Sequence, residues 1–235
     1  MEIAVISDLH LGDGSRADLF GHDDAEFLSF LTYLERNFES VVLLGDIFET
    51  LTGPSPFHQA RALQACEAAH PEIVARFRTP KYTYVHGNHD LVAARTMGAH
   101  HDITLEADGK RILFTHGHEY DFVERNARWL SLAGVWFSGW LMRFGLAPLC
   151  RFFHRVDVWA RGATSDPKTC RFQKWSVDLA KAKEVDVIVT GHTHRGVVAE
   201  HGSRLFLNGG SCSEGGISFL SMNTATGDYA VNTSW

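Results

Sequence analysis

The sequence predicts an α/β fold, and three observations support this prediction. Short apolar runs typical of buried strands recur along the chain, for example Ile3–Ile6 and Val41–Leu44. The stretch between these two runs has the apolar spacing of a helix, which makes a strand–helix–strand unit. Several of the runs also lead into glycine, carboxylate, amide or imidazole residues. In open α/β sheets, such residues collect beyond the carboxyl ends of the strands and form the functional site.

The N-terminal half alternates strands with helices. Asp23-Asp24 predicts a helix N-cap, and the helix that follows has one apolar face at helical spacing: Phe27, Phe30, Leu31, Leu34 and Phe38. Val41–Leu44 is the next strand. Phe57–Ala69 is then an alanine-rich helix that we expect to end near Pro71, ahead of a strand at Tyr82–His86.

The C-terminal half contains a predicted hairpin and a predicted meander. Ile103–Ala107 and Lys110–Thr115 flank Asp108-Gly109, a strong signal for a two-residue hairpin turn. A short helix is expected at Val177–Lys183, followed by a strand at Val185–Val189. Four later runs, separated by turn residues, predict antiparallel strands added to the sheet: Gly196–Ala199, Arg204–Leu207, Gly216–Leu220 and Tyr229–Val231.

Composition is that of an ordinary globular protein. The 235 residues suffice for one large domain, or for one domain with an inserted cap. Hydrophobic residues make up 45% and charged residues 21%. The four cysteines have no paired spacing, which argues against a zinc knuckle or a redox pair. The chain begins directly with a strand and has no signal-peptide pattern. We therefore expect a cytoplasmic protein with reduced thiols.

One segment, Arg125–Trp175, differs from the rest in composition. It contains seven Arg and two Lys against two acids, a net charge of +7, so the rest of the chain carries −13 of the total of −6. Five of the six tryptophans also lie in it. Two helices are predicted there, with apolar stripes at Trp129, Leu132, Ala133, Trp136, Trp140 and Phe144, and at Leu149, Phe152, Phe153, Val156 and Ala160.

Two interpretations of this segment remain open. It could be an interfacial element, with tryptophans in the headgroup region and arginines on anionic phosphates at the inner face of the cytoplasmic membrane. It could instead be a helical hairpin that buries both stripes against the domain or a second subunit. Nucleic acid is not an expected partner, because the excess of positive charge is confined to an apolar segment and the rest of the chain has a net negative charge. The oligomeric state is not predicted.

Residues with metal-binding side chains gather after the predicted strands: Asp8, His10, Asp46, Asn88, His89, Asp90, His116, His192 and His194. Carboxylate, imidazole and amide without thiolate suit Mn, Fe, Zn, Ni or Mg. Two ions about 3.5–4 Å apart accommodate more ligands than one ion can, and such a pair suits in-line displacement at phosphorus. A buried cluster of this kind without a cation would cost several kcal/mol.

The order of these motifs resembles that of the calcineurin-like metallophosphoesterases: Asp8-Leu9-His10, Gly45-Asp46, Gly87-Asn88-His89-Asp90, His116-Gly117 and Gly191-His192-Thr193-His194. The resemblance implies a four-layer α/β/β/α sandwich with an inserted helical hairpin cap. It also implies two divalent ions, manganese foremost, and a phosphorylated substrate. On this basis residues 1–120 and 176–235 would form the core and residues 121–175 the cap.

The resemblance also implies residue roles. Asp8, His10 and His194 would hold one ion, Asn88, His116 and His192 the other, and Asp46 would bridge them. His89 would stabilise the transition state or protonate the leaving oxygen, with Asp90 orienting its imidazole. His118 is the alternative to His116 as a ligand. Tyr120-Asp121 is interpreted either as a group behind the ligands or as a helix N-cap.

The layout is most similar to the UDP-2,3-diacylglucosamine pyrophosphohydrolase branch, except that His89 stands where that branch usually has Arg. The resemblance implies a cap that holds acyl chains, with Arg125, Arg128 and Trp129 as candidate substrate contacts. Our leading hypothesis is a two-metal hydrolase acting on an amphiphilic phosphoester or pyrophosphate at the membrane surface. The rival is a soluble nucleotide or phosphoprotein phosphodiesterase or phosphatase with a structural insert. A non-catalytic scaffold ranks lowest, since no ligand is missing.

Overall fold

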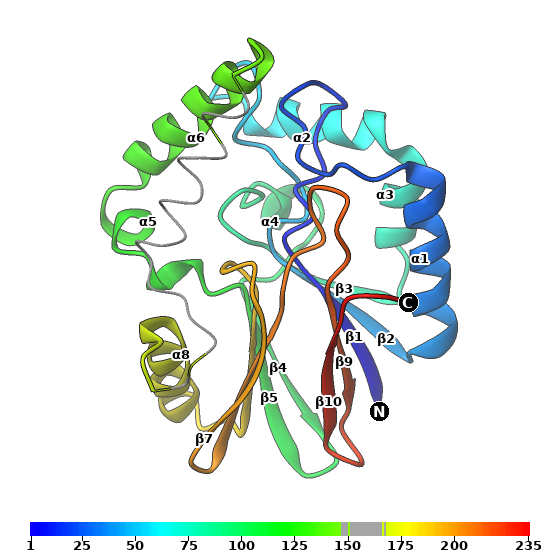
Figure 1. Cartoon of the computed structure of the whole chain (residues 1–235), viewed down its shortest axis with the longest axis vertical. Helices are drawn as coiled ribbons and strands as arrows, with labels where there is room; N and C mark the ends of the chain where they lie inside the picture. Colours follow the sequence, from blue (N-terminus) through cyan, green and yellow to red (C-terminus); the bar gives the residue numbers. More distant parts are fainter. Residues whose placement is uncertain (147–149, 151–165, 167) are drawn as a thin grey trace.

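Two five-stranded β-sheets pack face to face and are covered on their outer sides by helices (Figure 1). The computed structural model describes residues 1–146, 150, 166 and 168–235. The first sheet has the order β10-β9-β1-β2-β3, in which β1, β2 and β3 are parallel and β9 is antiparallel to β1. Its strands are β1 (Glu2–Ile6), β2 (Ser40–Leu44), β3 (Tyr82–Val85), β9 (Phe219–Asn223) and β10 (Asp228–Asn232).

The second sheet has the order β4-β5-β6-β8-β7. Its strands are β4 (Asp102–Ala107), β5 (Lys110–Thr115), β6 (Val187–Thr190), β7 (Gly196–His201) and β8 (Arg204–Gly209). The hairpin predicted at Asp108-Gly109 is confirmed, and both turn residues have positive φ. The prediction that the late strands all pair antiparallel was wrong for β8, which runs parallel to β6. The chain reverses twice, before and after β7, and so returns in the direction of β6.

The helices predicted in the N-terminal half are present, but their first and last residues differ from the prediction. α1 (Asp24–Asn37) begins at the expected cap, where the Asp23 side chain accepts hydrogen bonds from two backbone N–H groups. α2 (Gln59–Ala69) ends as expected, but Pro71 starts α3 (Pro71–Phe77) instead of only stopping α2. Proline fits the first position of a helix, where its missing N–H is not needed. α4 (Ala93–Thr96) and the 3-10 turn His118–Tyr120 are short.

Three apolar clusters confirm the four layers. Phe30 and Leu31 of α1 pack with Ala4 and Ile6 on the outer face of the first sheet. The alternate residues Ile3 and Val5 point the other way, as the pleat of a strand requires, and pack between the sheets with Phe114 and Val189. The outer face of the second sheet is covered by α8 (Arg171–Ala182), through Phe172 and Val177.

The inserted segment is described in part. α5 (Phe122–Asn126) leads into α6 (Arg128–Arg143), which contains the first predicted stripe from Trp129 to Trp140; Phe144 directly follows the helix. The second stripe, 149–160, lies outside the described residues. α8 begins at Arg171, so the boundary predicted between residues 175 and 176 falls inside this helix. Among the described residues, no helix is long and apolar enough to cross a membrane.

α6 is attached to the loop that follows β2 (Figure 1). The Arg143 guanidinium donates to the Thr52 carbonyl and pairs with Asp13 at 3.4 Å. Gly139 packs so closely on Thr52 that an added Cβ would lie 2.7 Å from the threonine side chain. One end of α6 is therefore fixed to the core through Gly139 and Arg143.

His70 forms a buried ionic contact that makes stability depend on pH. Its Nδ1 lies 2.7 Å from Asp24 and its Nε2 3.6 Å from Asp18. Burial lowers the pKa of His70, but the two carboxylates outweigh it, and the net shift is upward from 6.5. The protonated imidazole therefore stabilises the fold fully below about pH 6.5, and this contribution is lost as pH rises through the folded-state pKa.

We expect His70→Gln to lower the free energy of unfolding by about 2 kcal/mol at pH 6, a typical value for a charge-assisted hydrogen bond. The difference from the unsubstituted protein should shrink at pH 9. Urea unfolding at both pH values measures it, with His58→Gln, at an exposed position, as the control. A loss that is equal at the two pH values would mean that His70 acts by packing alone.

Candidate metal centre and active site

The predicted site residues follow five strand ends at one edge of the double sheet. β1, β2 and β3 of the first sheet run parallel, as do β5 and β6 of the second, so their carboxyl ends meet. The residues after these ends are Asp8 and His10, Asp46, Asn88 to Asp90, His116, and His192 and His194. Segments more than 180 residues apart in the chain thus form one site, as shown by the hydrogen bond of the His192 N–H to Asp8.

The backbone of the site is unusual. Asp8, His10, Asp46, His192 and His194 all have left-handed φ values, between 50° and 67°. Among the described residues, only three other non-glycine residues have positive φ. This conformation is unfavourable for side chains with a Cβ and collects at functional sites, although Asp and His tolerate it better than most residues. The turns after the strands therefore aim these side chains at the same point.

Two glycines make this close approach possible. A Cβ on Gly45 would lie 2.3 Å from the His116 ring, and a Cβ on Gly87 would lie 2.2 Å from the Asp46 carboxylate. Neither neighbour is free to withdraw, because both are buried in the site. The Gly-Asp and Gly-Asn pairs of the sequence are thus explained by packing as well as by the turn.

The first group of candidate ligands is Asp8, His10 and His194, whose ligand atoms all lie within 4.8 Å of one another. His194 Nε2 is 3.2 Å from Asp8 Oδ1. Burial raises the pKa of Asp8, but the nearby histidines, His194 first, outweigh burial and lower it. Asp8 is therefore a carboxylate that needs positive charge beside it.

The second group is Asp46, His116 and His192, again with ligand atoms within 4.8 Å. His116 Nδ1 donates to the Leu44 carbonyl at 2.9 Å, so Nε2 is the nitrogen that faces the site, 3.2 Å from Asp46 Oδ2. Burial opposes both charges, yet Asp46 raises the pKa of His116 to about 9, and the histidines hold that of Asp46 well below its usual range. A metal cation between these groups would take the place of the positive charge that Asp46 attracts.

Three buried polar atoms test whether metal ions fit here. His10 Nε2, His116 Nε2 and Asn88 Oδ1 make no hydrogen bond to any group in the described part of the chain. Buried polar groups are nearly always satisfied, so each such atom needs an explanation. All three are donor atoms of the kinds that bind divalent cations. The His/Asp/Asn set therefore fits metal ions.

His89 is oriented by Glu49, which sequence reasoning missed. His89 Nδ1 lies 2.7 Å and His10 Nδ1 3.1 Å from the same buried carboxylate oxygen of Glu49. Burial lowers the pKa of His89, but Glu49 and then Asp46 outweigh it and raise it to about 10. Glu49 lies three residues after Asp46, and that spacing at the end of Gly45-Asp46-Ile47-Phe48-Glu49 was the available signal.

The role predicted for Asp90 was wrong. Its carboxylate accepts hydrogen bonds from the backbone N–H groups of Ile47 and Gly87, at 2.7 and 2.6 Å, and from the Tyr84 hydroxyl at 2.5 Å. These donors occupy the Asp90 carboxylate, while the His89 ring contacts Glu49 instead. Asp90 therefore ties the loop after β2 to the loop after β3 and is a structural residue of the site.

The structure also shows the surroundings of Asp121 and His118, whose roles the sequence left open. Asp121 reaches the candidate ligand His192, with Oδ2 2.9 Å from Nε2, and it also precedes α5. His118 belongs neither to these two groups nor to the third, His10, Glu49 and His89, whose ligand atoms also lie within 4.8 Å of one another; its ring lies 5.6 Å from that of His116. Burial, then the neighbouring charge of His116, lower the pKa of His118 to about 2.

The three candidate substrate residues differ in position. The Arg128 guanidinium, at the start of α6, donates to the Asn88 carbonyl at 3.3 Å and so borders the metal site. Arg125 and Trp129 are exposed, Trp129 at 69%.

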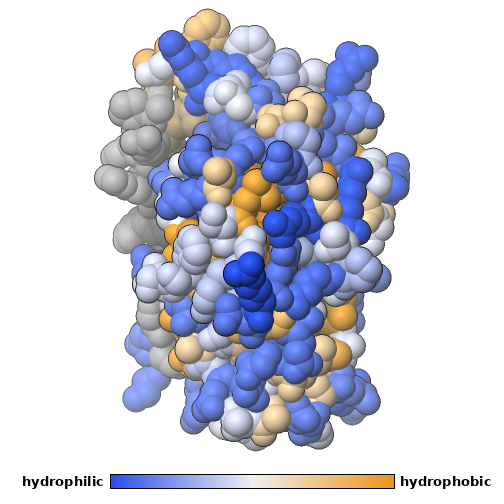
Figure 2. Space-filling view, turned by 90° about the vertical axis from the view of Figure 1, so that its right-hand side faces the viewer, coloured by the Kyte–Doolittle hydropathy of each residue, from blue (hydrophilic) through white to orange (hydrophobic). Residues whose placement is uncertain are grey.

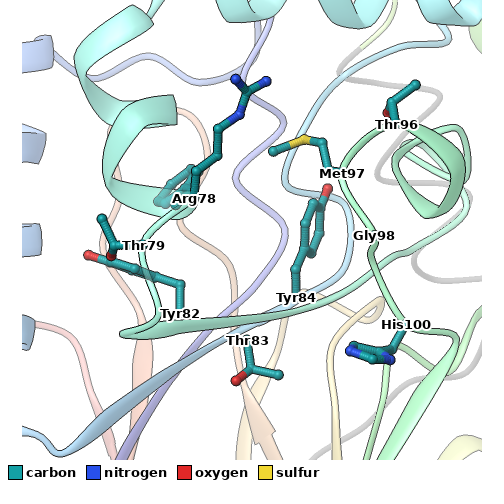
Figure 3. Close-up of a pocket in the computed structure, with 10 residues that line it drawn as sticks. Arg78, Thr79, Tyr82, Thr83, Tyr84, Thr96, Met97, Gly98 and His100 are labelled. Carbon is teal, nitrogen blue, oxygen red and sulfur yellow. The ribbon is translucent and has the colours of Figure 1, made fainter.

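A separate hollow of about 580 Å³ lies outside β3, the edge strand of the first sheet (Figure 3). Arg78, Thr79, Tyr82, Thr96 and His100 are among its lining residues. No candidate metal ligand lines it. We assign this hollow no part in the chemistry.

Two sheets with aspartate, histidine and asparagine gathered at their common edge define a metal-dependent hydrolase. The model of the calcineurin-like phosphoesterase family matches residues 1–196, and the chain belongs to this family. The protein is accordingly a metal-dependent phosphoester hydrolase.

Curated relatives agree with this assignment, and two solved structures agree with the fold. The chain is 29% identical over 217 residues to UDP-2,3-diacylglucosamine hydrolase of Shigella dysenteriae, with 85% of each chain covered. It is also 29% identical to the enzyme of that name in Ralstonia nicotianae, over 81% of this chain and 76% of the other. A novel archaeal phosphodiesterase is similar in fold, at a TM-score of 0.50 and 16% identity over all of both chains. Vps29 of Chaetomium thermophilum is equally similar, over 99% of this chain and 92% of the other.

Proposed function

We propose that the protein hydrolyses a phosphoester or pyrophosphate bond in an amphiphilic substrate resembling UDP-2,3-diacylglucosamine. Such a substrate joins a charged phosphate group to acyl chains, and a site for it must place metal ligands beside apolar surface. The names of the relatives support this substrate class. The arrangement of α6 next to the metal site supports it independently.

The position and surface of α6 are the observation that carries the proposal. Arg128, the first residue of α6, contacts the Asn88 carbonyl. Trp129, Leu130 and Phe137 along the helix are 69%, 49% and 59% exposed, and Phe144 directly after it is 74% exposed. Exposed apolar residues gathered on one element mark a binding surface more often than scattered ones do. By contrast, the face that carries α1 and α3 is mostly hydrophilic, with small apolar spots (Figure 2).

Two divalent ions would be held by the residues brought together at the strand ends. We assign Asp8, His10 and His194 to one ion, Asn88, His116 and His192 to the other, and Asp46 to both. When bound, the ions supply the polarisation of the phosphoryl oxygen and the activation of the attacking water. A donor set without thiolate suits manganese, iron, zinc, nickel and magnesium. We propose manganese, with the other four as outcomes to be tested.

The residues of the chain contribute proton transfer and anion binding. His89, kept protonated by Glu49, would donate a proton to the leaving oxygen. Arg128 would bind a substrate phosphate oxygen, since a guanidinium pairs well with phosphate. We place the reaction at the inner face of the cytoplasmic membrane, because the segment that includes α6 combines arginines with tryptophans.

A substrate panel tests the proposal. Metal-stripped protein with added Mn²⁺ is assayed on UDP-2,3-diacylglucosamine, UDP-N-acetylglucosamine, a chromogenic phosphodiester and a phosphomonoester. We expect the acylated sugar nucleotide to have the highest kcat/KM, well above its counterpart without the two long acyl chains. If the small water-soluble esters are cleaved faster, the amphiphilic substrate class is wrong. A membrane role is tested separately by co-sedimentation with anionic vesicles.

Removing the Arg128 side chain should weaken substrate binding. We expect Arg128→Ala to lower kcat/KM on the panel's best substrate by about 10- to 100-fold, the value of one charge-assisted contact. Arg128→Lys should recover only part of this loss, because a lysine cannot form the bidentate contact. Arg125→Ala is the matched control on the same segment. Equal, small effects of Arg125→Ala and Arg128→Ala would remove Arg128 from the site.

A further inference from the structure

The segment that starts the insert contacts the metal site at two points. The Asp121 carboxylate reaches His192 at 2.9 Å, and the Arg128 guanidinium reaches the Asn88 carbonyl at 3.3 Å. His192 and Asn88 are both assigned to the same ion under the proposed function. Asp121 and His192 are largely buried, with side chains 15% and 4% exposed. Their contact is therefore shielded from competing water.

The chemistry of this contact selects one form of the imidazole. An ionised carboxylate only accepts hydrogen bonds, so the proton of the contact belongs to Nε2 of His192. In a neutral imidazole the lone pair then lies on Nδ1, the nitrogen left to bind a cation. A carboxylate behind a ligating histidine fixes the tautomer and the ring orientation, and it makes the ligand more basic.

We propose that Asp121 is a positioning residue that holds His192 for one of the two ions, so that this ion's affinity depends on the segment that begins the insert. The inference rests on the proposed two-ion site. Asp121 suits this role because local bonds anchor it: its N–H donates to the His118 carbonyl at 3.1 Å, and its carbonyl accepts from the Arg125 N–H at 3.0 Å. The residues assigned to the other ion alone, Asp8, His10 and His194, follow β1 and β6 in the core.

The coupling works in both directions, as linkage requires. An ion that draws the lone pair of His192 strengthens the Nε2–H donor, and so strengthens the bond to Asp121. Binding of that ion therefore stabilises the start of the insert, and we expect a smaller effect from the ion held by Asp8, His10 and His194.

Calorimetric titration of Mn²⁺ into the metal-stripped full-length protein tests the proposal. We expect two binding events in the unsubstituted protein. Asp121→Ala should raise the dissociation constant of one event by about 10- to 100-fold and that of the other event much less. Asp121→Asn keeps the size and an acceptor oxygen but loses the charge, and should have a smaller effect. Asp178→Ala, at an exposed carboxylate that pairs with Lys181, is the control.

A spectroscopic readout separates positioning from a general loss of structure. Nitrogen NMR of the histidine rings should show His192 with its proton on Nε2 in the unsubstituted protein, and a mixture of tautomers in Asp121→Ala. Equal weakening of both ions, or no weakening of either, overturns the inference. If the unsubstituted protein itself does not bind two ions, the proposed two-ion site fails first, so the two failures are distinguishable.

Discussion

Replacing Asp46 with Asn should abolish most of the phosphoesterase activity. The carboxylate lies 3.2 Å from His116, accepts a hydrogen bond from the His89 N–H at 2.8 Å, and is proposed to contact both ions. Loss of a partner behind a ligand typically costs 10- to 100-fold. Loss of a shared ligand should therefore cost more than about 100-fold in kcat, together with weaker binding of both ions. Steady-state kinetics and Mn²⁺ titration measure these two effects.

Asp108→Asn is the matched control for this substitution. Asp108 has nearly the same left-handed φ, 50° against 51°, but it lies in the hairpin turn between β4 and β5. Asparagine tolerates this conformation, so neither variant should fail for backbone reasons. An Asp46→Asn variant that keeps more than a tenth of the activity would contradict a bridging role.

Removing the His89 imidazole should slow the reaction without removing the metal. We expect His89→Ala to lower kcat by about 10²- to 10⁴-fold, the usual contribution of a positioned proton donor. Mn²⁺ affinity should change little, because His89 is not among the assigned ligands. His101→Ala, at a half-exposed histidine away from the metal groups, is the control. The rates and the metal affinity are measured on the same preparations.

Glu49→Gln should differ from His89→Ala in a diagnostic way. Glu49 orients both His89 and His10, so its loss should lower kcat and also weaken one ion. A His89→Ala variant that loses metal as strongly as Glu49→Gln does would make His89 a ligand instead of a proton donor. Unchanged kinetics in Glu49→Gln would show that His89 does not depend on this carboxylate.

The sequence was sufficient to place the residues that follow strand ends. Apolar runs such as Val41–Leu44 mark buried strands, and parallel strands bring their carboxyl ends to one edge. The prediction that Asp8, Asp46 and His192 lie together needed only this rule and the order of the motifs. The α1 cap at Asp23 and the turn at Asp108-Gly109 were equally local, and both are confirmed.

What depends on contacts between distant segments was not predicted. Asp90 and Glu49 are both acids near His89 in the fold, and only the geometry shows that Glu49 contacts the imidazole while backbone N–H groups occupy Asp90. The start of α8 at Arg171 was not predicted, because the aromatic residues of its first turns resemble the composition of the preceding segment. Pro71 was interpreted only as the end of a helix. A proline fits equally well at the first position of the next helix, so its presence alone does not distinguish the two.

The most direct test of the two-metal account is to count the bound ions and follow the rate as they are restored. Metal-stripped protein receives Mn²⁺ in steps, while elemental analysis of the protein and hydrolysis of UDP-2,3-diacylglucosamine are measured at each step. The account predicts no activity without metal and full activity only as occupancy approaches two ions per chain. Full activity at one ion, or activity in the metal-free protein, would contradict it.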